Sequence, residues 1–193
     1  MHNALAAPSL AYVPLRLTQA PAAMKGMAIL LGTLLLAASS WVEVPMVPVP
    51  MTMQTYAVVL VGALCGWRMG GLIVLAWLGE ALIGLPVLAG GTGGPMRFAG
   101  PTGGYLIGFL AAAALVGWLA ERGWTGGNLV RSFTAMLLGH AVALALGVCW
   151  LATLIGWEKA VAAGFVPFIA GTLVKSAFAV ATVEAARRTR RAG

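Results

Sequence analysis

The sequence predicts an all-α integral membrane protein, built as a bundle of six transmembrane helices with both termini in the cytoplasm. Of its 193 residues, 61% are hydrophobic and only 9% are charged. A soluble domain has about 45–50% apolar and about 25% charged residues. The apolar residues form long uncharged runs, and most Lys and Arg residues stand between alternate runs. This composition excludes an ordinary cytosolic enzyme and a disordered segment.

Each predicted helix is a run close to the roughly 20 apolar residues that cross a bilayer. The six runs cover residues 26–42, 53–67, 69–86, 102–120, 132–157 and 164–186. The second run begins only at residue 53, because Pro45, Pro48 and Pro50 cannot continue a helix. We therefore expect a cytoplasmic tail at 1–23, one membrane domain at 24–186 and a basic tail at 187–193.

Lys and Arg residues set the orientation, because they concentrate in cytoplasmic loops. With both termini inside, nine basic residues lie on the inner side, and only Arg97 and Lys159 lie on the outer side. The two longer outer segments, 43–52 and 88–100, are rich in proline and in glycine, respectively. Proline keeps the first extended, and glycine lets the second approach other backbone closely. We expect both to fold over the helices and cap a ligand pocket.

Two charged residues stand within the predicted helices, where a charge costs at least ~2.5–3.5 kcal/mol. They are Lys175 in the sixth helix and Glu80 in the third. Either Lys175 forms an internal ion pair with Glu80 or snorkels to the membrane surface, or it binds an anionic ligand in a cavity. The interpretation as a ligand site is favoured. Thr172 shares a helix face with Lys175, because it stands three residues earlier. Arg97 is either a solvated loop residue or a fork that binds a carboxylate.

Signatures of catalysis are missing from the sequence. A P-loop needs glycine directly before Lys-Ser, but Val174 precedes Lys175 and Ser176 here. There is also no GxSxG motif, no metal-ligand spacing around the two cysteines, and no basic stripe interleaved with aromatic residues. We therefore expect no enzyme, no cofactor or metal, and no nucleic-acid partner. An intramembrane protease that uses His140 with Ser176 or Ser132 is the weakest alternative.

The first predicted helix carries Ala28 and Gly32, a spacing of small residues that lets another helix approach closely. From the residues alone, the approaching helix belongs equally to the chain's own bundle or to a separate subunit. The arginines of the tail at 187–193 are expected to fix the topology and to bind anionic membrane lipid.

Three segments carry motifs that occur together in one known family. They read Val-Pro-Met-Thr-Met-Gln-Thr at 49–55, Gly-Leu-Pro-Val-Leu-Ala-Gly-Gly at 84–91 and Gly-Pro-Thr-Gly-Gly-Tyr-Leu at 100–106. Over about residues 24–186 the chain resembles the BioY family, the biotin-specific substrate-binding (S) components of energy-coupling-factor transporters. The resemblance implies a multi-pass protein of the bacterial inner membrane that binds biotin beneath its outer loops. It also implies a transmembrane coupling subunit and two ATPase subunits as partners, with Ala28 and Gly32 facing the coupling subunit.

The candidate binding residues suit a ligand with an apolar ring, a ureido group and a carboxylate. They are Gln54, Glu80, Arg97, Thr102, Gly103, Tyr105, Thr172 and Lys175. The family's last helix carries a motif like Pro-Gly-Asp-x-x-Lys, and here Thr172 replaces the aspartate and Ala170 the proline. Glu80 is a hypothesis for the missing acceptor. The alternative function is a stand-alone transporter or facilitator for biotin or another small carboxylate-bearing vitamin, although no internal repeat is visible.

Overall fold

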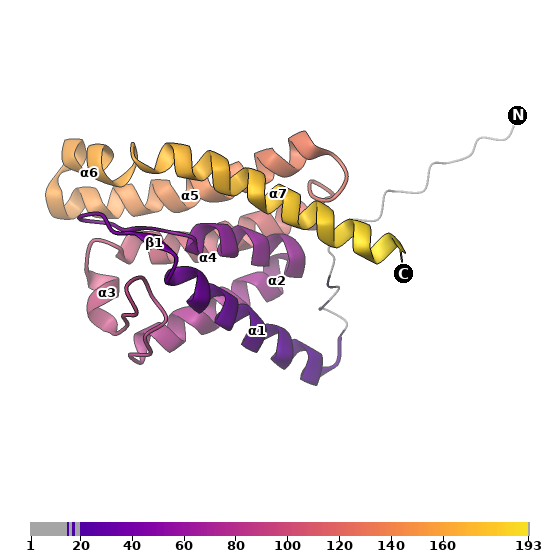
Figure 1. Cartoon of the computed structure of the whole chain (residues 1–193). Helices are drawn as coiled ribbons and strands as arrows, with labels where there is room; N and C mark the ends of the chain where they lie inside the picture. Colours follow the sequence, from indigo (N-terminus) through magenta and orange to yellow (C-terminus); the bar gives the residue numbers. More distant parts are fainter. Residues whose placement is uncertain (1–14, 16, 18–19, 193) are drawn as a thin grey trace, which may run out of the picture.

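The computed structural model describes residues 15, 17 and 20–192, which form seven helices and one short β-ribbon. In chain order these are α1 (Ala22–Ser40), β1 (Glu43–Val44), β2 (Met51–Thr52), α2 (Gln54–Leu82), α3 (Pro95–Ala99), α4 (Gly103–Glu121), α5 (Leu129–Ile155), α6 (Trp157–Gly164) and α7 (Phe168–Ala192). The β-ribbon, α3 and α6 lie at one end of the bundle, opposite the end where α7 finishes (Figure 1). The all-helical architecture expected from the sequence is confirmed.

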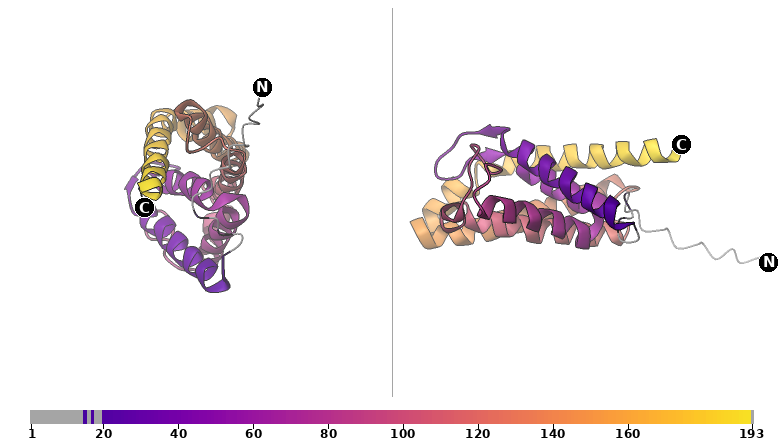
Figure 2. Two further views of the ribbon diagram at one scale, coloured as in Figure 1. Left: turned by 90° about the vertical axis from the view of Figure 1, so that its right-hand side faces the viewer. Right: turned by 90° about the horizontal axis from the view of Figure 1, so that it is seen from below.

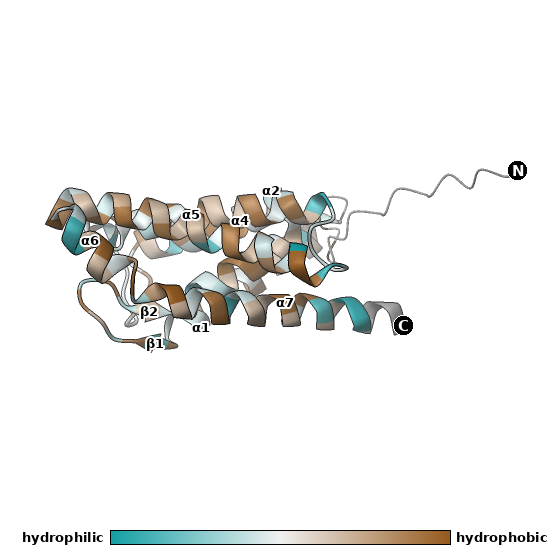
Figure 3. Ribbon diagram, turned by 90° about the horizontal axis from the view of Figure 1, so that it is seen from above, coloured by the Kyte–Doolittle hydropathy of each residue, from teal (hydrophilic) through white to brown (hydrophobic). Residues whose placement is uncertain are grey.

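Five helices are long and apolar enough to cross a membrane, namely α1, α2, α4, α5 and α7. They leave many large apolar side chains exposed, which suits a surface that contacts lipid. Hydrophilic residues stand out on α6 and on the last turns of α7, toward the two ends of the bundle (Figure 3). The number of long helices differs from the six predicted runs because two of those runs, 53–67 and 69–86, lie together in α2.

Helix α2 reverses direction at Gly66. This residue has φ 79° and ψ 172°, a conformation that only glycine adopts readily. A Cβ at Gly70 would lie 2.9 Å from the Cα of Gly62, whereas eight residues along a continuous helix span about 12 Å. The arms at 54–65 and 67–82 therefore pack against each other. The turn lies slightly before residue 68, which separates the second and third predicted runs.

The turn of α2 is held by α4. A Cβ at Gly117 would collide with the backbone of Trp67, so that position needs glycine. Glu121, at the end of α4, accepts a hydrogen bond from the Trp67 backbone N–H at 3.2 Å through Oε1. This carboxylate satisfies a backbone donor that the start of the second arm of α2 leaves free.

Two apolar clusters hold the bundle together. In the first, Trp77 of α2 stacks on Phe109 of α4 with ring centroids 6.2 Å apart. The Trp77 indole N–H also donates to the carbonyl oxygen of Val87 at 3.0 Å, which ties the segment after α2 to the core. The second cluster lies nearer the end of α7 and includes Val59, Val116, Met136 and Val183, all essentially buried.

The two outer segments approach each other at one end of the bundle. Strands β1 and β2 pair in antiparallel register, with Glu43 opposite Thr52. Gly91, in the glycine-rich segment, has φ 63°, and a Cβ there would lie 3.0 Å from Cη2 of Trp41. The close approach of the two segments therefore depends on glycine at this position. The short helices α3 and α6 complete this end, and neither was predicted from the sequence.

Helix α1 packs on the second arm of α2 through its small residues. A Cβ at Gly32 would lie 2.5 Å from Cγ2 of Ile73, and Ala28 also packs against the main core. Larger residues of α1, including Met27, Leu31 and Leu34, are left exposed. The small-residue face of α1 thus contacts the chain's own bundle, and a leucine- and methionine-rich surface remains uncovered.

Candidate binding cavity

A cavity lies at the end of the bundle that carries the β-ribbon, α3 and α6. Its lining residues come from several elements: Val49, Pro50, Thr52, Gln54, Thr55, Leu88, Ala89, Thr92, Arg97, Thr102, Tyr105, Leu106, Phe109, Ala143, Leu144, Phe168 and Lys175. The space inside, including the part open to solvent, is about 640 Å³. Lys175 and Arg97 are the charged residues among those that line it.

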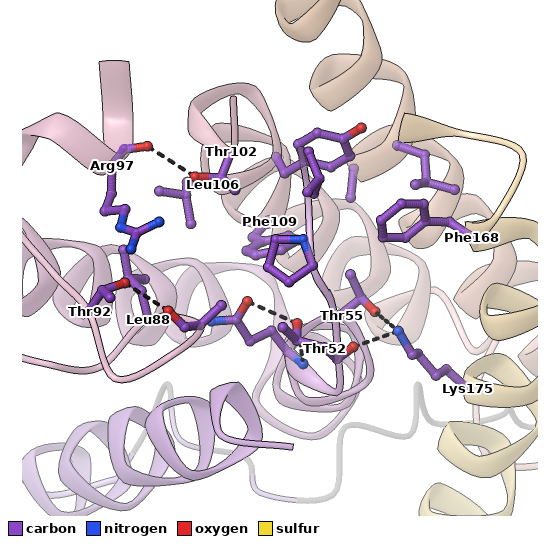
Figure 4. Close-up of a pocket in the computed structure, with 17 residues that line it drawn as sticks. Thr52, Thr55, Leu88, Thr92, Arg97, Thr102, Leu106, Phe109, Phe168 and Lys175 are labelled. Carbon is purple, nitrogen blue, oxygen red and sulfur yellow. Dashed lines mark hydrogen bonds between the residues drawn. The ribbon is translucent and has the colours of Figure 1, made fainter. Parts of the chain in front are cut away.

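Lys175 reaches the cavity from the middle of α7, and only 8% of this residue is exposed. Its Nζ donates to the carbonyl oxygen of Thr52 at 2.6 Å and to Thr55 Oγ1 at 3.2 Å (Figure 4). An ammonium group has three donors, so one remains for a further acceptor. No carboxylate of the described residues forms an ion pair with Lys175. An anionic group in the cavity would therefore compensate its charge.

Gln54 begins α2 directly behind the β-ribbon and is 4% exposed. Its Oε1 accepts a hydrogen bond from Thr52 Oγ1 at 3.0 Å, and its backbone N–H donates to the same hydroxyl at 3.3 Å. Its Nε2 is buried and has no partner among the described residues. A buried N–H without an acceptor is unfavourable, so an acceptor on a ligand in the cavity would satisfy it.

Arg97 lies on the opposite side of the cavity from Lys175 (Figure 4). It belongs to α3 and is exposed. Its backbone carbonyl accepts a hydrogen bond from Thr102 Oγ1 at 3.1 Å, which joins α3 to the start of α4. The cavity thus has one buried and one exposed cation, separated by its mainly apolar interior.

Aromatic rings form part of the cavity wall. Tyr105 of α4 stacks on Phe168 of α7 with ring centroids 6.2 Å apart. The Tyr105 hydroxyl donates to the carbonyl oxygen of Gly164 at 2.8 Å, so it ties α4 to the end of α6. Tyr105 therefore offers a ligand chiefly the face of its ring, and Phe109 adds another apolar surface.

Five of the eight predicted binding residues line the cavity, namely Gln54, Arg97, Thr102, Tyr105 and Lys175. Glu80, Gly103 and Thr172 are outside the lining set. A Cβ at Gly103 would collide with the carbonyl oxygen of Phe98, so this glycine serves the close packing of α3 on α4. The ion pair between Lys175 and Glu80 that the sequence left open does not form. The ion pair found in the described part of the chain joins Arg187 and Glu184.

Several lining residues were not predicted from the sequence. Thr55 was the easiest to find, because it ends the motif at 49–55 and follows Gln54 directly. Ala143 and Leu144 of α5 carry no signal, since small and apolar residues fill every membrane helix of this chain. Phe168 begins α7 seven residues before Lys175 and so shares its face of the helix.

His140 and Ser176 do come together, with the Ser176 hydroxyl 3.2 Å from His140 Nδ1. His140 Nδ1 is also 2.9 Å from the carbonyl oxygen of Met136. Both side chains are buried, and neither lines the cavity. No described acidic residue hydrogen bonds to the histidine, and a catalytic histidine needs such an orienting group and access to substrate. The contact therefore joins α5 to α7 and lacks the layout of a protease site.

The fold and the cavity together define a class, a multi-pass membrane protein with a small-molecule binding site at one end of a helical bundle. Comparison with known proteins then gives the family. The BioY family model matches residues 11–192 of this chain. The protein belongs to the BioY family.

Several curated relatives are similar over most of their length. The biotin transporter BioY of Rhizobium etli is 40% identical over 141 residues, which are 69% of this chain and 75% of that protein. A probable biotin transporter BioY of Pyrococcus horikoshii is 38% identical over 143 residues, or 74% of this chain and 83% of that protein. The Rhodobacter capsulatus biotin transporter BioY is 42% identical over 148 residues, or 68% of this chain and 77% of that protein.

A solved structure has the same fold. It is a crystal structure at 2.1 Å of the S-component for biotin from an ECF-type ABC transporter. The two structures superpose with a TM-score of 0.76 and 29% sequence identity, over 90% of this chain and 96% of that chain.

Proposed function

We propose that this protein is the membrane-embedded S component of an energy-coupling-factor transporter, and that it captures biotin in the cavity for uptake into the cell. The observation that carries the proposal is the buried Lys175 ammonium, which has an unused donor in a mainly apolar cavity. The relatives described as biotin transporters and the solved biotin S-component support biotin as the ligand. The chain transports and does not catalyse, and ATP hydrolysis belongs to partner subunits.

The chemistry of biotin fits the cavity. Lys175 binds the valerate carboxylate, because its charge is buried and uncompensated, whereas the exposed Arg97 is hydrated. Gln54 Nε2 supplies a donor for a second acceptor of the ligand. The thiophane ring packs on the apolar walls that include Phe109 and Phe168. Thr102 and Tyr105 shape the wall at the start of α4, while Glu80, Gly103 and Thr172 lie outside the lining.

We place six segments across the membrane, namely α1, the two arms of α2, α4, α5 and α7. Four basic residues lie at one end of the bundle. They are Arg68 after the turn of α2, Arg122 in the loop between α4 and α5, Arg131 in the first turn of α5, and Arg187 near the end of α7. These basic residues favour the cytoplasm for that end of the bundle. The cavity then opens on the outer side, beneath the lid formed by residues 43–52 and 88–100.

The partners in this proposal are a transmembrane coupling subunit and two ATPase subunits, with α1 as the docking helix. Ala28 and Gly32 hold α1 close against the bundle, and the exposed Met27, Leu31 and Leu34 make the contact. The variant Leu31→Trp should reduce ATP-dependent uptake and leave biotin affinity unchanged. Leu146→Trp, on the exposed face of α5, is the matched control. Equal uptake by both variants would exclude this face of α1.

Two measurements test the function itself. Calorimetric titration of the purified protein with biotin and with biotin methyl ester should give clearly tighter binding for the acid. Vesicles that contain this chain alone should not accumulate biotin, and uptake should appear when coupling and ATPase subunits are added with ATP. Accumulation by the chain alone would favour the stand-alone transporter instead.

A further inference from the structure

The β-ribbon at 43–52 has one face on the cavity and another that is exposed and apolar. On the inner side, Val49 and Thr52 are buried and line the cavity. On the outer side, Val47 is 94% exposed and Val44 is also exposed. Trp41, just before the ribbon, is 66% exposed although the end of its indole lies close to Gly91. A two-stranded ribbon is at best marginally stable in water by itself. So large an apolar surface therefore needs an explanation.

The ribbon lies on the flank of the bundle between α1 and α7 (Figure 2). It continues directly from α1, and the backbone N–H of Met53 donates to the carbonyl oxygen of Val42 at 2.9 Å. On the other side it contacts α7, where Lys175 donates to Thr52. A Cβ at Gly171 of α7 would lie 2.9 Å from Sδ of Met51.

The surfaces on either side of the ribbon are those of membrane helices. Leu34 and Leu35 are exposed on α1, and Leu173 and Val174 are exposed on α7. Both helices are long and apolar enough to span the bilayer. The exposed face of the ribbon is thus continuous with the lipid-facing surfaces of α1 and α7. This continuity indicates that lipid also covers the ribbon.

The length of the first arm of α2 gives the depth of the ribbon. This arm, residues 54–65, is about 18 Å long at 1.5 Å per residue. The hydrocarbon core of a bilayer is about 30 Å thick. With the turn at Gly66 near the inner surface, the ribbon that precedes the arm begins at membrane depth, in the outer leaflet.

From this continuity and this depth we infer that the β-ribbon is a lateral wall of the cavity whose outer face, with Val44 and Val47 and with Trp41 beside it, is seated in the outer leaflet of the membrane. Tryptophan is enriched at the boundary between acyl chains and headgroups, which suits the exposed Trp41 beside the ribbon. Lipid contact therefore holds this part of the lid closed. The cavity opens when the ribbon moves outward against lipid.

Fluorescence quenching in nanodiscs tests the position of the ribbon without any ligand. Val47→Cys is labelled with an environment-sensitive dye in the Cys149→Ser background, because Cys149 is exposed whereas Cys65 is buried. Lys159→Cys on α6, at the same end of the bundle, is the control. Nitroxide on the lipid acyl chain should quench the dye at position 47 about threefold more than at 159, and aqueous iodide should do the reverse.

Two outcomes would overturn the inference. Strong iodide quenching at position 47 without lipid quenching would place the ribbon in water. Protection of position 47 from both quenchers would mean that a second copy of the chain covers the ribbon. Neither outcome depends on biotin. The position of the ribbon is therefore tested independently of the proposed function.

The gating role does rest on the proposed function and has its own test. Val47→Asp should speed biotin dissociation from nanodisc-embedded protein about tenfold, because a carboxylate weakens the seating of the ribbon in lipid. Val47→Ile keeps an apolar side chain and should leave the dissociation rate unchanged. Equal rates for both variants, with biotin still binding, would refute gating by lipid contact.

Discussion

Replacing Lys175 by Met tests whether the buried ammonium recognises the biotin carboxylate or only holds the lid. The substitution keeps a long flexible side chain and removes the charge. It also removes the hydrogen bonds to Thr52 and Thr55, which tie α7 to the ribbon and to α2. Both roles of Lys175 predict weaker binding of biotin in the variant. The affinity for biotin alone therefore does not distinguish carboxylate recognition from holding the lid. The fold should persist, because the variant loses a charge from the membrane interior.

The magnitude follows from the contact that is lost. A hydrogen bond to a charged group contributes about 1.5–3 kcal/mol. Loss of the contact between ammonium and carboxylate should therefore weaken biotin binding about 10- to 150-fold. Biotin methyl ester has no carboxylate for the ammonium to bind. Its affinity for Lys175→Met should therefore change only because the hydrogen bonds that hold the lid are lost. If Lys175 binds the carboxylate, the preference for acid over ester should disappear in Lys175→Met.

Four calorimetric titrations complete the test, with each ligand measured on the unmodified protein and on Lys175→Met. Arg97→Met is the matched control, since it removes the other cation of the cavity lining. Its effect should be under about threefold, because the exposed guanidinium is already solvated. An unchanged acid-to-ester ratio in Lys175→Met would refute carboxylate binding there. If Arg97→Met instead abolished the preference for biotin over its methyl ester, the carboxylate would bind at Arg97, on the opposite side of the cavity from Lys175.

Three further predictions concern the lid, the α2 turn and the second polar group. Gly91→Ala places a Cβ against Trp41 and should speed biotin dissociation several-fold, measured with labelled biotin. Gly84→Ala, also at positive φ but with open space around it, is the control for backbone strain. Glu121→Ala removes the acceptor of the Trp67 N–H and should lower the Tm by about 2–8 °C without changing biotin affinity. Gln54→Leu removes a buried donor that has no partner and also the acceptor of the Thr52 hydroxyl, so the Tm of the free protein should fall by about 2–4 °C, while biotin binding weakens about tenfold. An unchanged affinity in Gln54→Leu would exclude the amide from the ligand contacts.

The helical bundle was predictable because the bilayer imposes both length and polarity on a membrane helix. The turn between the second and third runs was placed too late by a few residues. Gly66, Gly70 and Gly71 all permit a turn, and what selects Gly66 is packing on Gly117 and the Glu121 carboxylate of α4. Such long-range contacts leave no trace in the local pattern.

The polar part of the cavity was more predictable than its walls. A charge such as Lys175 inside an apolar run attracts attention because its burial must be compensated. An alanine that faces a cavity, such as Ala143, looks the same in sequence as one that faces the core. Glu80 attracted attention for the same reason as Lys175, yet its position on α2 lies outside the cavity lining. The type of residue therefore indicates that a polar site exists, and packing decides which polar residues share it.

The arrangement of α1 and the ribbon links the cavity to the proposed docking helix. No residue of α1 is in the cavity lining, so the proposed site involves this helix only indirectly. However, α1 leads through Trp41 into the ribbon, whose Thr52 carbonyl accepts the hydrogen bond from Lys175. A ligand that recruits Lys175 acts on the bond that holds the ribbon, and the ribbon is continuous with α1. In the proposed assembly, a partner on α1 would therefore sense biotin through the position of the lid.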